Sequence, residues 1–125
     1  MRKPFLTASI CALALALHFL LGWIWTPVAG VIGGFVGQQS GWKISAIGLG
    51  LSWSILVFYN LIVANAQVIE MGRVLGELFG GLPGTLVFVF TAIIGLLLGA
   101  ISGVLGSSLR PLIGHKDRTR HGSPS

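Results

Sequence analysis

Long apolar runs separated by short polar pieces restrict what this chain can fold into more than any other feature of its sequence. Four such runs fall at about residues 5–22, 27–41, 44–66 and 85–106. They are continuous and not alternating, which is typical of membrane-spanning helices and not of transmembrane strands. Only 9% of the residues are charged, against about 25% in a soluble domain. The sequence therefore predicts an all-α integral membrane protein, folded as a four-helix transmembrane bundle.

The polar segments complete the predicted organisation. Residues 66–81 alternate polar and apolar side chains at helical spacing, which predicts a short amphipathic helix before the fourth span, either in the membrane interface or extending the third span. Residues 1–109 then form the transmembrane domain. Residues 110–125 are basic and polar, and we expect a disordered cytoplasmic tail.

The first two runs leave alternatives open. Arg2 and Lys3 before an apolar run would suit a cleaved signal peptide, but Phe5–Trp25 exceeds the usual core of about 7–15 residues. We therefore expect a retained span. Residues 27–41 are rich in glycine, so a re-entrant half-helix competes there with a full crossing.

The distribution of basic residues favours four crossings. With four crossings, seven of the eight basic residues fall on one side, and only Arg73 lies on the other. Short basic segments prefer the cytoplasm. We predict a multi-pass protein of a plasma or inner membrane with both termini cytoplasmic. The formal charge of +5 is concentrated near the ends, which indicates contact with anionic lipid and not with nucleic acid.

Two decamers share one pattern of small and apolar residues. Residues 30–39 read GVIGGFVGQQ and residues 99–108 read GAISGVLGSS. In the four-crossing arrangement both would end a helix at the cytoplasmic face. Two tandem helical hairpins from a duplication would leave this pattern, and so would convergence in a composition dominated by these residues.

Small residues also recur every four positions along the second and fourth runs. Such stripes let two helix backbones approach closely in a membrane, where burial of apolar surface does not join helices. We expect the second helix to pack on the fourth, with Gly33 and Gly37 facing the glycines of the fourth; a homo-oligomer contact is the alternative. The proposed helix-packing residues are Ala29, Gly33, Gly37, Gly41, Gly95, Gly99 and Gly103.

Few polar residues lie inside the spans. His18 is an ionisable group within the first run, and Asn60 and Gln67 lie seven residues apart, on one helix face. They would line a polar pathway if they met in one cavity. The alternatives are an interfacial histidine and amides that hold helices together by hydrogen bonds.

The sequence contains no set of residues arranged for catalysis, cofactor binding or metal binding. It has a single cysteine, and no nucleophile with a partnering base or phosphate-binding loop is visible. We therefore predict a non-enzymatic membrane protein without a cofactor, acting as a structural or accessory subunit. Its partners would be the lipid bilayer and a homo-oligomer or larger membrane complex. A small channel or transporter is the alternative.

Overall fold

The computed structural model describes residues 2–114, and all its regular elements are helices. The five α-helices are α1 (Arg2–Leu21), α2 (Thr26–Val36), α3 (Gly41–Val63), α4 (Asn65–Leu78) and α5 (Gly84–Gly114). Two short 3-10 helices, η1 (Trp23–Trp25) and η2 (Gln38–Ser40), join α1 to α2 and α2 to α3. The prediction of an all-α chain is confirmed for these residues.

Three helical segments are long and apolar enough to cross a membrane. They are Arg2–Leu21, Gln38–Val63 and Gly84–Ile113. The segment Trp23–Val36 is also apolar but shorter. At about 1.5 Å per residue it reaches roughly 21 Å, against about 30 Å of hydrocarbon in a bilayer. The chain thus has the helices of a membrane protein.

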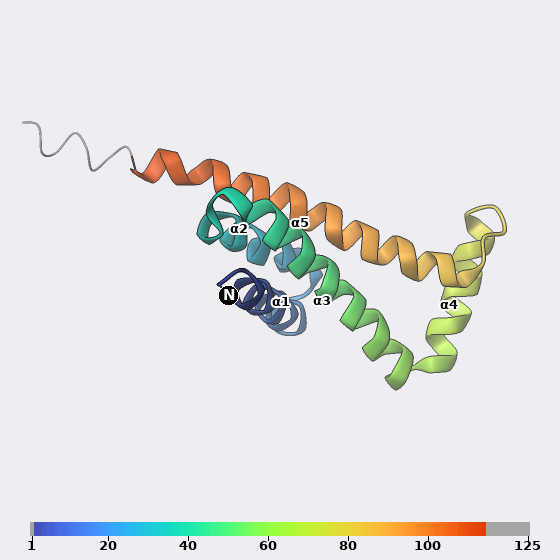
Figure 1. Cartoon of the computed structure of the whole chain (residues 1–125). Coiled ribbons are helices and arrows are strands. Elements are labelled where there is room, and N and C mark those ends of the chain that lie inside the picture. Colours follow the sequence, from blue (N-terminus) through green and yellow to red (C-terminus); the bar gives the residue numbers. More distant parts are fainter. Residues whose placement is uncertain (1, 115–125) are drawn as a thin grey trace, which may run out of the picture.

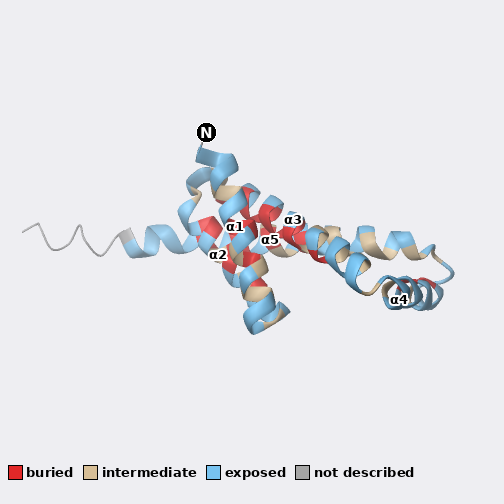
Figure 2. Cartoon of the chain, turned by 90° about the horizontal axis from the view of Figure 1, so that it is seen from below, coloured by how far each residue is buried: buried red, intermediate tan, exposed pale blue. Residues whose placement is uncertain are grey.

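The helices form two crossing layers. In Figure 1 α3 and α5 run across the picture side by side, while α1 and α2 are seen nearly end-on. Figure 2 shows the same crossing from below, with the buried residues gathered where the helices meet. The contact between α3 and α5 is the most extensive, followed by that of α2 with α5. The packed interior therefore lies where the helices cross, and the segments farther from the crossing are more exposed.

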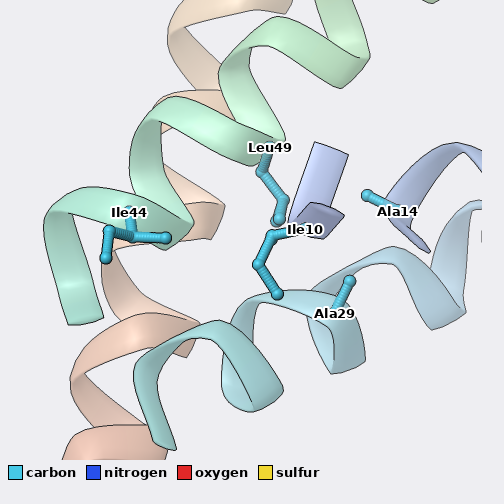
Figure 3. Close-up of a cluster of buried hydrophobic side chains, with 5 residues drawn as sticks. All are labelled: Ile10, Ala14, Ala29, Ile44 and Leu49. Carbon is cyan, nitrogen blue, oxygen red and sulfur yellow. The ribbon is translucent and has the colours of Figure 1, made fainter. Parts of the chain in front are cut away.

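A small apolar cluster fills the junction of α1, α2 and α3. Ile10 and Ala14 come from α1, Ala29 from α2, and Ile44 and Leu49 from α3, as Figure 3 shows. Ala14, Ala29 and Leu49 are completely buried. Two of these three are alanines, so backbones and not large side chains occupy much of the interior.

The second helix is shorter than the predicted span of residues 27–41. It ends at Val36, and Gly37 caps it with a backbone bond from its N–H to the carbonyl of Gly33. Gln38 then takes a left-handed backbone conformation with φ of 55°. This turn reverses the chain so that α3 can begin at Gly41 and pack back along α2.

The third helix is as long as the predicted span of residues 44–66 but begins and ends three residues earlier, because the chain bends at Ala64. That residue has φ of −135° and ψ of 47°, outside the helical region, and it separates α3 from α4. The expected amphipathic helix therefore exists as the separate helix α4, and not as an extension of α3. Figure 1 shows α4 bridging the diverging ends of α3 and α5.

The last helix continues beyond the expected boundary at residue 109. It reaches Gly114 and contains Pro111. Residues 110–114, which we assigned to the tail, are thus helical. The rest of the predicted tail, residues 115–125, lies outside the described residues.

Candidate functional site

The glycines of α5 lie against α3. A methyl group built on Gly99 would come within 2.7 Å of the Cα of Ala46 and would also meet the carbonyl oxygen of Ser45. One built on Gly103 would come within 2.7 Å of the Cα of Trp42. One on Gly95 would come within 2.9 Å of the Cβ of Trp53. Along this face even a methyl group would push the two helices apart.

A second set of close contacts joins α2 to α5 through the two decamers. A methyl group on Gly34 would come within 2.8 Å of the Cα of Gly103, and one on Gly30 within 2.9 Å of the Cβ of Ser102. Gly106 of α5 lies equally close to the backbone of Val31. Gly34 and Gly103 are equivalent positions of the two decamers, so the repeated sequences pack on each other.

The glycines of α2 pair differently from our expectation. Gly33 points toward Ile10 of α1 and Ser45 of α3, and Gly37 lies against Gly41. Neither faces the glycines of α5. Residues four apart drift by about 40° per step on a helix of 3.6 residues per turn. Because α2 is covered by α1, α3 and α5, successive small residues contact different neighbours.

Ser45 provides a polar contact inside this packing. Its hydroxyl donates a hydrogen bond of 2.7 Å to the carbonyl oxygen of Gly30, and its side chain is completely buried. The bond ties α3 to α2 where the glycines already bring the backbones together. Ser45, Gly30 and Gly34 are packing residues that the four-residue spacing did not predict, although both glycines belong to the repeated decamer. The repeated decamer could therefore have indicated Gly30 and Gly34, whereas no pattern in the sequence indicated Ser45.

The three candidates for a polar pathway do not share a pocket. Asn60 lines a pocket of about 380 Å³ between α3, α4 and α5, together with residues such as Met71 and Thr91. His18 and Gln67 line none of the five main surface pockets of the described residues. The bend at Ala64 places Asn60 and Gln67 on different helices, which removes their expected common face. Half-buried His18 has no hydrogen-bond partner for Nδ1 within residues 2–114.

The charged side chains of α4 form a compact exposed network. Arg73 contacts Glu70 through Nη2 and Oε1 at 2.5 Å, and Glu77 through Nη1 and Oε1 at 2.6 Å. The hydrogen bonds and the charge of Arg73 hold the pKa of Glu70 below its usual value. The three side chains stay more than half exposed, so water screens the network and it contributes little to stability.

The opposite side of α4 fixes this helix to α5. Gly72 and Gly76 are buried there: a methyl group on Gly72 would come within 3.1 Å of the Phe88 ring of α5, and one on Gly76 would meet the carbonyl of Leu82 in the connecting turn. Leu82 N–H donates a bond of 2.9 Å to the carbonyl of Gly76. Arg73 and Glu77 line a groove of about 500 Å³ with Thr85 and Phe88 of α5, so the charged network borders this helix contact.

Residues able to hold a metal ion do not gather in the part of the chain that the structure describes. Within residues 2–114, no three His, Cys, Asp or Glu side chains come together. Cys11 is a buried free thiol on α1. Comparison with protein-family models, with curated protein sequences and with solved structures found no match.

Proposed function

We propose that this chain is a small non-catalytic membrane protein that works as a structural or accessory subunit of a membrane assembly. The observation that carries the proposal is the separation of His18, Asn60 and Gln67, while close backbone contacts and apolar side chains fill the interior. A transporter needs polar groups that converge on one path. A subunit needs only a stable body and outer faces for lipid or a partner.

The outer faces, and not the glycine stripes, are the surfaces available for assembly. The close glycine contacts are made between helices of one chain, which favours intrachain packing over the homo-oligomer reading. Many large apolar side chains remain exposed, including Phe58, Ile62 and Leu97. These faces suit lipid tails and a partner in the membrane, and the charged face of α4 suits a polar partner at its surface.

Successive helices run in opposite directions, as four crossings would require, although α1 and α2 lie steeply across α3 and α5 in Figure 1. Ile10 of α1 lies by Gly33, and Leu6 lies with Val36 in one groove, so α1 and α2 run in opposite directions. Gly34 lies by Gly41 while Gly30 lies by Leu49, so α2 and α3 are also antiparallel.

The direction of α5 and the positions of the basic residues support the proposed fourth crossing and orientation. Trp42 lies by Gly103 while Trp53 lies by Gly95, so α3 and α5 are antiparallel. Arg2 and Lys3 share a groove with Gln38, close to the start of α3. The basic residues of α1 and α3 thus sit near one end of the helices, which favours a cytoplasmic location for that end and for both termini.

Cysteine labelling of intact cells tests this topology. In a Cys11→Ser background, we expect Glu77→Cys on α4 to react with a membrane-impermeant maleimide from outside. Gln39→Cys, between α2 and α3, should react only after the membrane is permeabilised. External labelling of Gln39→Cys would reject four crossings with both termini cytoplasmic.

A flux assay separates the accessory subunit from the channel. Purified protein in liposomes should raise the permeability to potassium, chloride and protons no more than a matched Asn60→Leu variant does. The reason is that Asn60 lines a pocket without His18 or Gln67. Flux above that of empty vesicles that saturates with substrate and disappears in Asn60→Leu would instead establish the channel or transporter.

A further inference from the structure

A groove at the start of α1 combines two cations with an apolar floor. Its volume is about 430 Å³, and it lies between the first turns of α1 and the turn from α2 to α3. Arg2, Lys3 and Gln38 supply polar groups at this groove. Phe5 and Val36, which also line it, are exposed apolar side chains with relative accessibilities of 75% and 50%.

The two cations of the groove are electrostatically uncompensated within the described chain. The salt bridges there all involve Arg73, which holds Glu70 and Glu77 on α4. Arg2 and Lys3 make none within residues 2–114. An anion that reached this groove would therefore meet two free basic groups without displacing a protein carboxylate.

The apolar floor determines which kind of anion fits. A small inorganic anion would use Arg2 and Lys3 and leave Phe5, Leu6 and Val36 in contact with water or lipid. An anionic phospholipid uses both parts, because its headgroup is acidic and its chains are apolar. A zwitterionic phospholipid carries the same phosphate but adds a cation that Arg2 and Lys3 would repel.

We propose that this groove is a binding site for one anionic phospholipid, with the headgroup phosphate at Arg2 and Lys3 and an acyl chain along Phe5, Leu6 and Val36. The site rests on the groove and on insertion into a membrane, and not on the accessory role proposed above. The other described basic residues near this end, Lys43 and Arg110, lie outside the groove. Lys43 lies 5.5 Å from the centre of the Trp42 ring.

Lipid retention measured by native mass spectrometry tests the proposal. The full chain is purified from nanodiscs of equal parts phosphatidylglycerol and phosphatidylcholine, at low salt. The double variant Arg2→Gln/Lys3→Gln should bind phosphatidylglycerol at least about tenfold more weakly, because it removes both cations near the headgroup. The matched variant Lys43→Gln/Arg110→Gln removes the same charge outside the groove and should retain the lipid.

A third variant tests the floor of the groove without changing charge. Val36→Trp should fill the groove and reduce phosphatidylglycerol retention while circular dichroism shows unchanged helicity. Equal losses in the two charge variants, or full retention in Val36→Trp, would overturn the proposal in favour of general electrostatic attraction. Displacement of the lipid by millimolar inorganic phosphate would overturn it in favour of a small-anion site. None of these outcomes depends on the flux measurement.

Discussion

Replacing Gly99 by alanine should lower the free energy of unfolding by about 1–3 kcal/mol, the range for forcing extra atoms into a packed interior. The added methyl group would meet the Cα of Ala46 at 2.7 Å and the carbonyl oxygen of Ser45. Both are backbone atoms of α3, so no side-chain rotation relieves the clash. The helices must separate along their largest contact. Gly99→Leu should have a larger effect.

Unfolding in mixed micelles with increasing dodecyl sulfate, followed by circular dichroism, measures this change. Gly72→Ala is the matched control, since Gly72 is also a buried helical glycine. Its nearest neighbour would be the ring tip of Phe88 at 3.1 Å, which can move. That variant should stay within about 0.5 kcal/mol of the parent protein. Equal stability of Gly99→Ala and Gly72→Ala would mean that α5 does not rest on α3 at Gly99.

Replacing Gly34 by alanine should destabilise the contact between α2 and α5 by a similar amount, about 1–3 kcal/mol. The new methyl group would lie 2.8 Å from the Cα of Gly103, again against backbone. Gly33→Ala is the comparison within the same helix. Its methyl group would face the side chains of Ser45 at 2.6 Å and Ile10 at 3.1 Å. Ile10 can shift its side chain, but moving the Ser45 hydroxyl weakens its bond to Gly30, so this second variant should cost less than Gly34→Ala but more than Gly72→Ala.

The same unfolding assay measures the pair. Gly34→Ala should unfold at a lower fraction of dodecyl sulfate than Gly33→Ala. The reverse order would place Gly33, as the four-residue spacing indicates, at the contact with α5.

The sequence predicted the helices well because their physical cause is local. A chain in a bilayer must satisfy its backbone hydrogen bonds internally, so continuous apolar runs at 5–22 and 85–106 became α1 and most of α5. The amphipathic helix was predictable for a similar reason. The spacing of Glu70, Arg73 and Glu77 is a property of neighbouring residues, and their network forms within one helix.

The ends of α2 and α3 had no comparable local cause. Gly37 terminates α2, yet Gly33 and Gly34 lie within it, since glycine is common both inside membrane helices and at their ends. The bend at Ala64 carries neither glycine nor proline, although the polar residues Asn65 and Gln67 follow it. It follows from the need of α4 to reach back toward α5, which is a tertiary constraint.

The partners of the glycines were the least predictable part of the candidate site. A glycine in a membrane helix indicates that another segment packs closely there, but the sequence does not identify that segment. Gly99 meets α3, Gly34 meets α5 and Gly33 faces α1 and α3, although hydropathy treats all three alike. Ser45 could be recognised only with the carbonyl of Gly30 already in position.

Helix α4 sets the distance between the far ends of α3 and α5. A loop between α3 and α5 would let their far ends move together or apart, but a helix of 14 residues is a rod of about 21 Å. It is attached at one end through the bend at Ala64 and along its side through Gly72 and Gly76. The three helices therefore form a triangle in which α4 holds the far ends of α3 and α5 at a set distance. Adding or removing one helical turn in α4 would change that distance, and with it the angle between α3 and α5.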